Sequence, residues 1–219
     1  IHICVGLVVS ICPFIFKVNY QLILLSLIFI IVNTFLYIKD SAKSMNRVER
    51  DTFGTIYFPI SILILSSFFW DKPISFFLAV LTLTFADPIA SIIGSRSKHH
   101  FIPWIDKKSI NGSLAMFCTT FIIITIGTDA MARYYGSSFY LPLHILIGLA
   151  IFTSICATLS EIISYKGSDN LTIPLISFFS YEIFLINYTH GNLFHLLIWT
   201  ILSVLIFTFA YKYQSLDFS

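Results

Sequence analysis

Three acidic residues of this chain lie inside apolar stretches, where a carboxylate is costly and is a candidate for function. They are Asp87, Glu161 and Glu182. Asp87 lies about two turns from the end of its apolar run, and Glu161 lies within a turn of the end of its own. Both carboxylates are therefore expected at the same membrane face. Glu182 lies near the middle of its run, so we expect it to be separate and to pair with a polar group across the bundle.

A basic loop follows Asp87 and ends in KKSINGS, which runs directly into another apolar stretch. A helix that begins here, capped by Asn111 or Ser113, would present free N–H groups beside Lys107 and Lys108. Gly112 would let a ligand approach the backbone. These parts suit a phosphate group, although a loop of this kind is also what commonly flanks a membrane helix. The sequence alone leaves both interpretations open.

A third polar segment, ATLSEIISYKGSDNLTIPL, places Glu161 before a turn that contains glycine and is followed by Asp169 and Asn170. Asp169 and Asn170 are residue types that turns favour. Together with Glu161 they also offer the hard oxygen ligands that Mg²⁺ uses. Either interpretation places them at the same membrane boundary as the basic loop.

Small residues recur every fourth position around Asp87, at Ala86, Ala90 and Gly94. Such a stripe favours close packing of two helices. It could also clear space beside the carboxylate for a bulky ligand, and we expect a lipid tail to lie along it.

The elements that must position these residues are membrane helices. The chain has 219 residues, of which 57% are hydrophobic and only 11% are charged, and its mean hydropathy is +0.88. Too few charges are present to cover a soluble domain, so the composition predicts an integral membrane protein. Apolar runs predict helices near 1–16, 20–38, 53–70, 74–94, 112–128, 141–164, 172–189 and 193–212. The expected fold is an all-α, multi-pass transmembrane helical bundle of about seven or eight spanning helices. We expect a single domain over residues 1–219, with a native N-terminal piece missing.

The basic residues sort to one side of such a bundle. If every segment crosses the membrane, the loops 39–52, 95–110 and 165–171 and the C-terminus share one face and hold ten of the 13 lysines and arginines. The other face holds Lys17, Lys72 and Arg133. By the positive-inside rule, the basic loops and the clustered carboxylates are expected on the cytoplasmic side.

Carboxylates, lysines and a helix N-terminus at one membrane boundary fit a magnesium-bound nucleotide that acts on a lipid head group. Phosphoryl transfer needs cations and N–H groups around the phosphates and a carboxylate near the attacking hydroxyl. The sequence contains neither the P-loop pattern nor a kinase-like GxGxxG, so it supports neither common soluble nucleotide fold.

The order and spacing of these motifs resemble the polyprenol kinase family, which includes phytol kinase, farnesol kinase and the catalytic part of dolichol kinase. The resemblance covers residues 83–176, more weakly 47–54, and looks closest to the phytol kinase branch. It rests on the following residues: Asp87-Pro-Ile-Ala90, Gly94, Lys108-Ser109, Gly112-Ser113, Glu161, Gly167-Ser-Asp169-Asn170 and Pro174. Where the family often has a second glycine soon after the one matching Gly94, this chain has GSRSKHH.

The resemblance implies a kinase that uses CTP, with Mg²⁺, to phosphorylate the hydroxyl of a membrane isoprenoid alcohol such as phytol, farnesol or a polyprenol. No nucleic-acid partner is expected. Asp87, Lys108 and Glu161 are the candidate catalytic residues, and Asp87, Glu161 and Asp169 the candidate metal ligands. The candidate nucleotide contacts are Gly94, Arg96, Lys107, Lys108, Ser109, Gly112 and Asn170. The sequence leaves open whether Asp87 holds the metal or accepts the proton of the hydroxyl.

Two other functions share some of these features. A CTP-dependent diacylglycerol kinase or a phosphatidate cytidylyltransferase would need a similar site on a different lipid. A small ion- or proton-coupled transporter would instead use Asp87, Glu161 and Glu182 as a path, and its carboxylates would be spread across the membrane depth.

Overall fold

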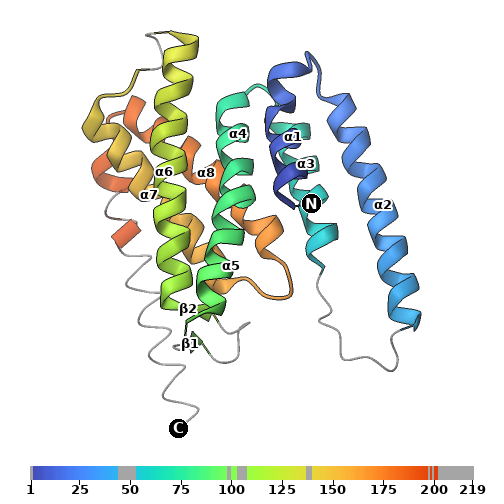
Figure 1. Cartoon of the computed structure of the whole chain (residues 1–219). Coiled ribbons are helices and arrows are strands. Elements are labelled where there is room, and N and C mark those ends of the chain that lie inside the picture. The colour runs from blue at the N-terminus through green and yellow to red at the C-terminus, as the bar shows by residue number, and fades with distance from the viewer. Residues whose placement is uncertain are drawn as a thin grey trace.

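Apolar helices make up most of the described part of this protein, which is seen here in a computed structural model (Figure 1). The structure describes residues 2–43, 53–97, 100–102, 108–136 and 140–201, without 197 and 199. The helices are α1 (His2–Ile15), α2 (Tyr20–Lys43), α3 (Gly54–Phe68), α4 (Pro73–Leu81), α5 (Asp87–Ser95), α6 (Ile110–Tyr135), α7 (Leu143–Ile163) and α8 (Asp169–Thr189). A π-helical turn, η1 (Thr82–Ala86), joins α4 to α5, so that 73–95 is one continuous helical rod.

The predicted apolar segments correspond well to these helices. Each of the seven segments between residues 1 and 189 is helical, and the eighth, 193–212, is helical at 193–196 and lies largely outside the described residues beyond that. The largest difference is in α6, which begins at Ile110 and continues to Tyr135, whereas the apolar run predicted 112–128.

Five helices of the described residues are long and apolar enough to cross a membrane. They are α2, the rod 73–95, α6, α7 and α8. The helices α1 and α3 have only 14 and 15 residues, which gives each a length of roughly 21–22 Å, short of the ~30 Å hydrocarbon core. The all-α multi-pass fold is therefore confirmed, with five candidate spans and the two shorter apolar helices α1 and α3 among the described residues.

One short strand pair interrupts the helical pattern. Strand β1 (His100–Ile102) pairs antiparallel with β2 (Lys108–Ser109), and β2 leads directly into α6. We call the end of the bundle that carries this pair the ladder end. In Figure 1 it is the lower end, where α5 and α7 finish and α3, α6 and α8 begin.

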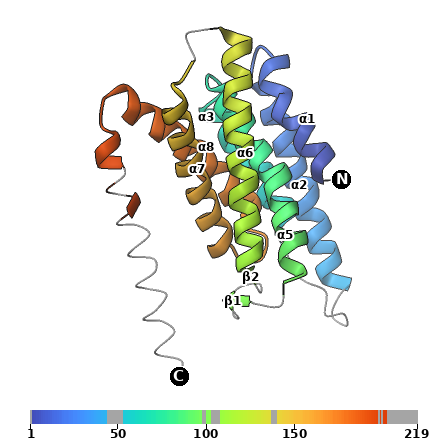
Figure 2. The same cartoon turned by 60° about the vertical axis from the view of Figure 1, so that its left-hand side comes forward.

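The rod 73–95 lies at the centre of the packing. Phe76, Leu78 and Val80 on α4 are fully buried, and α4 packs against α1, α6 and α8. Towards the ladder end, α6 lies between α7 and α5 (Figures 1 and 2). By contrast α2 packs mainly on α3 and exposes apolar side chains such as Ile31, which is 68% exposed, as expected for a helix that faces lipid.

Candidate active site

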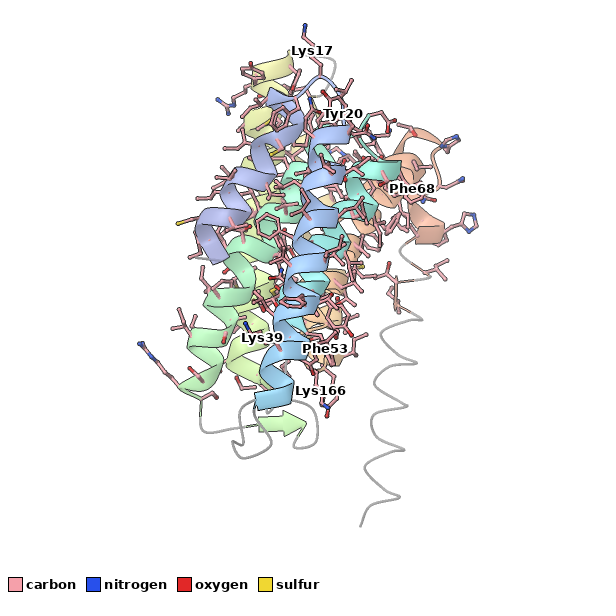
Figure 3. The ribbon with its side chains drawn as sticks, turned by 90° about the vertical axis from the view of Figure 1, so that its right-hand side faces the viewer. Lys17, Tyr20, Lys39, Phe53, Phe68 and Lys166 are labelled. Carbon is pink, nitrogen blue, oxygen red and sulfur yellow. The ribbon has the colours of Figure 1, made fainter. Side chains whose placement is uncertain are left out.

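The described residues that border the basic loops lie at the ladder end. Figure 3 shows Lys39, Phe53 and Lys166 together at this end of the bundle and Lys17 at the opposite end. The backbone N–H of Phe53 donates to the carbonyl oxygen of Lys166 at 3.0 Å, which joins the start of α3 to the turn between α7 and α8. The predicted grouping of these loops at one face is confirmed for the described residues.

An ion pair lies at the centre of this end. The Lys108 ammonium on β2 is 2.7 Å from Glu161 Oε1, in the last turn of α7, and 4.0 Å from Asp169 Oδ2, at the start of α8. These side chains are only 14%, 8% and 20% exposed, respectively. Residues 108, 161 and 169 are thus brought together from three separate elements, as the sequence predicted.

Asp87 completes the group from a fourth element. It is the first residue of α5 and interacts electrostatically with Asp169, Lys108 and Glu161. Three carboxylates against one ammonium leave these four residues with a formal charge of −2. Such an excess of negative charge in a poorly solvated place favours binding of a cation.

A local break in the rod 73–95 positions Asp87. Pro88 has no N–H to donate, and its ring would clash with the carbonyl of Thr84 in a regular helix. The chain responds with the π-helical turn Thr82–Ala86 just before Asp87. The Thr82 hydroxyl donates to the Leu78 carbonyl oxygen at 2.9 Å, and the Thr84 hydroxyl donates to the Val80 carbonyl oxygen at 2.7 Å. These bonds give partners to carbonyl groups near the π-helical turn. Turns of this type are frequent at functional sites.

The second carboxylate oxygen of Glu161 has no hydrogen-bond partner among the described residues. In the described part of the chain, Glu161 Oε2 is buried without a hydrogen-bond partner, although the residue is only 6% exposed. An unpaired carboxylate oxygen at such a place is costly and calls for a bound donor or cation.

The carboxylates have the chemistry that Mg²⁺ prefers, but they do not form a closed metal centre. Among the described residues, no group of three or more His, Cys, Asp or Glu side chains is arranged to hold a metal. Magnesium in nucleotide sites is usually held by one or two carboxylates together with the phosphates. Asp87, Glu161 and Asp169 as metal ligands therefore stay a prediction.

The start of α6 differs from the prediction. Ser109, not Asn111 or Ser113, is the N-cap: its backbone is extended, and its Oγ accepts the Gly112 N–H at 3.1 Å. The Asn111 amide instead donates to Ser97 Oγ at 3.4 Å. The helix begins earlier than the apolar pattern indicated because β2 delivers an extended residue, which is the cap conformation, at position 109.

The two glycines of this region pack against each other. A Cβ on Gly112 would lie 3.0 Å from the Ala90 carbonyl oxygen and 3.1 Å from Gly94 Cα. Gly112 is buried and its N–H is bonded to Ser109, so its observed role is in helix packing, and its contact with a nucleotide stays a prediction.

The stripe of small residues has the packing role. Ala86 and Ala90 are buried in a cluster with Met116, Ala157 and Ile173, and Gly94 meets α6 at Gly112. The expectation that a lipid tail lies along this face is therefore wrong, because α6 fills it.

Three predicted site residues remain. Asn170 belongs to the cluster around Lys108, since its amide donates to Asp169 Oδ1 at 3.1 Å. Arg96 is exposed at the C-cap of α5. Lys107 lies outside the described residues.

Glu182 is separate, as predicted. It accepts a hydrogen bond from Ser75 and lies 3.4 Å from the Lys72 ammonium, near the end of the bundle opposite the ladder end. A cavity of about 530 Å³ adjoins this pair, lined mainly by α4 and α8.

Two features of the site were missed from sequence: the contact of Gly54 with Asn170 and the π-helical turn at Pro88. The sequence signal that could have indicated the π-helical turn is a proline directly after an acidic residue within a long apolar run.

Comparison with known proteins reveals several relatives that are named as phytol kinases. The chain is 27% identical over 135 residues to a phytol kinase of Synechocystis, covering 60% of this chain and 54% of that protein. It is 28% identical over 194 residues to a probable chloroplastic phytol kinase 3 of Glycine max, covering 81% and 59%. It is 34% identical over 145 residues to a probable chloroplastic phytol kinase 2 of Oryza sativa, covering 62% and 45%. The chain spans about half the length of these relatives. No family model and no solved structure matches it.

Proposed function

Because this chain is related to the phytol kinases of the polyprenol kinase family, we propose that it transfers a phosphoryl group from a nucleoside triphosphate to the hydroxyl of a membrane isoprenoid alcohol. CTP is the proposed donor and Mg²⁺ the proposed metal. The observation that carries the proposal is the group at the ladder end, where the Lys108 ammonium lies against Glu161 and near Asp169, with Asp87 close enough for its charge to interact with theirs.

Each residue of the group has a proposed part in the reaction. A new bond forms between the alcohol oxygen and the γ-phosphorus, the bond from that phosphorus to the bridging oxygen breaks, and the nucleoside diphosphate leaves. Asp87 accepts the proton of the hydroxyl. Lys108 contacts the phosphate oxygens, and Asn170 orients Asp169. Such a reaction depends mainly on positioning and on neutralising charge.

A magnesium ion would supply the positive charge that these residues lack. Glu161 and Asp169 would hold it, and the free Oε2 of Glu161 supports this assignment. The ion would polarise the phosphates. The protein groups would still have to exclude water and hold the hydroxyl in line.

The depth of the site suits a substrate that already resides in the bilayer. Lys108, Glu161 and Asp169 lie at or near the ends of helices long and apolar enough to span a membrane, and Asp87 lies within the rod 73–95, eight residues before its end. The excess of lysine and arginine on the loops of this end supports a cytoplasmic orientation.

Radiolabel transfer tests the proposal. Membranes containing the protein are supplied with γ-labelled CTP or ATP and with phytol, farnesol, dolichol or diacylglycerol. We expect label in an isoprenoid alcohol, preferentially from CTP, and no label with Asp87→Asn. Asp129→Asn is the matched control, since Asp129 pairs only with Arg133, within the exposed last turns of α6, among the contacts described. Label in diacylglycerol alone, or a CDP-lipid with pyrophosphate, would replace the proposal with one of the related lipid reactions.

A further inference from the structure

The first residue of α3 touches the turn that presents Asp169 and Asn170. This turn between α7 and α8 is tight, with positive φ angles of 49° at Lys166 and 85° at Gly167. The Phe53 N–H donates to the Lys166 carbonyl, and a Cβ built on Gly54 would lie 3.7 Å from the Gly167 carbonyl oxygen. The start of α3 therefore packs directly against this turn.

The contact at Gly54 falls on the side chain of Asn170. A Cβ on Gly54 would lie only 2.7 Å from Asn170 Nδ2, closer than real Cβ atoms approach other heavy atoms. The backbone of Gly54 does not have a positive φ, so glycine is not required there by conformation. What its missing side chain provides is room for the amide of Asn170.

That amide in turn holds one oxygen of Asp169. Asn170 donates to Asp169 Oδ1 twice, from Nδ2 at 3.1 Å and from its backbone N–H at 2.9 Å. Asn170 Nδ2 also lies 3.4 Å from the Gly167 carbonyl oxygen. With Oδ1 held in this way, Oδ2 is the oxygen that faces Lys108, at 4.0 Å.

We propose that Gly54 is a positioning residue, whose lack of a side chain lets Asn170 fix the Asp169 carboxylate towards Lys108. The chain of contacts runs from Gly54 through Asn170 and Asp169 to the ammonium. The inference rests on the proposed function, because the carboxylate that it orients is one of the two proposed to hold the magnesium ion of the nucleotide.

Gly54→Ala is the direct test. The added methyl must displace the Asn170 amide, which releases Asp169 Oδ1. Residues that orient a ligand-binding carboxylate typically contribute about tenfold or more to affinity or activity. We therefore expect the KM for CTP to rise about tenfold while the KM for the alcohol stays within about twofold.

The second variant, Asn170→Ser, keeps a hydrogen-bonding group but is shorter and leaves room for the methyl. If Gly54 acts through Asn170, Gly54→Ala has less than about a twofold effect on the KM for CTP in the Asn170→Ser background, and the two changes are not additive. Gly148→Ala is the matched control. Its Cβ would meet only the far end of the Phe184 ring, at 3.3 Å, away from the site.

Thermal unfolding in detergent measures the same coupling between Gly54 and Asn170 and needs no activity assay. Gly54→Ala is expected to lower the Tm in the natural background but not with Asn170→Ser, because alanine favours a helix over glycine once the clash is gone. An equal effect of Gly54→Ala in both backgrounds would overturn the inference. If no donor and alcohol pair is active, the proposed function fails, and the unfolding cycle still decides whether Gly54 positions Asn170.

Discussion

Replacing Lys108 by methionine separates the structural and the catalytic contributions of the ion pair. Methionine keeps much of the length and apolar volume of the lysine stem but removes the charge. At an effective dielectric constant of about 20, an ammonium 2.7 Å from a carboxylate interacts by about 6 kcal/mol, and one at 4.0 Å by about 4 kcal/mol. Much of this offsets the cost of removing three mostly buried charges from water.

The net effect of Lys108→Met is expected to be a loss of about 3–5 kcal/mol in the free energy of unfolding, as when one partner of a buried pair is removed. The variant leaves Glu161 and Asp169 with no cation in contact among the described residues. Adding Glu161→Gln removes one of these carboxylates and should recover about 1–2 kcal/mol. Phosphoryl transfer should be lost in the single and the double variant alike.

The assay is equilibrium unfolding in mixed micelles, followed by helical circular dichroism, alongside label transfer. Addition of Mg²⁺ is the internal control, since a divalent ion should stabilise Lys108→Met more than the natural protein. A loss below about 0.5 kcal/mol, the size of an ordinary surface substitution, would mean that the pair has no energetic role. Retained transfer in Lys108→Met would remove the lysine from the mechanism.

Three further outcomes follow from the same structure. Ser109→Ala removes the N-cap of α6 and should cost about 1 kcal/mol of unfolding free energy in the same micelles. Gly112→Ala forces α6 away from α5 and should cost about 1–3 kcal/mol, whereas an unchanged stability would contradict the close glycine packing. Glu182→Gln weakens the contact with Lys72 and should lower the unfolding temperature while leaving label transfer within about twofold; abolished transfer would contradict the separation of Glu182 from the candidate active site.

Helix positions could be predicted from the sequence because one requirement dominates them, the satisfaction of backbone hydrogen bonds inside the bilayer. An apolar run in a bilayer must form a helix to satisfy its backbone, so hydropathy alone located seven helices of the described chain. The convergence of Lys108, Glu161 and Asp169 could be predicted for a related reason. Each lies within a few residues of a helix end, and alternating crossings bring these ends to one face.

Contacts between particular side chains could not be predicted in this way. Hydropathy does not distinguish a stripe that packs on a helix from one that faces a ligand, so Ala86 and Ala90 needed the position of α6 to decide. The N-cap depended on the extended strand before it, a feature only two residues long. The Gly54–Asn170 contact joins residues more than a hundred positions apart, and no local pattern encodes it.

The depths of the four site residues support different parts in the reaction. Asp87 lies eight residues before the end of α5, which is about 12 Å along the helix axis, whereas Glu161 lies two residues, about 3 Å, from the end of α7. Asp169 begins α8, and Lys108 precedes α6. Lys108, Glu161 and Asp169 therefore lie at or near helix ends, whereas Asp87 lies further along its helix. Under the proposed function, the residues assigned to the nucleotide are nearer the helix ends than the carboxylate assigned to the hydroxyl, which is the order that phosphorylation of a bilayer-resident alcohol requires.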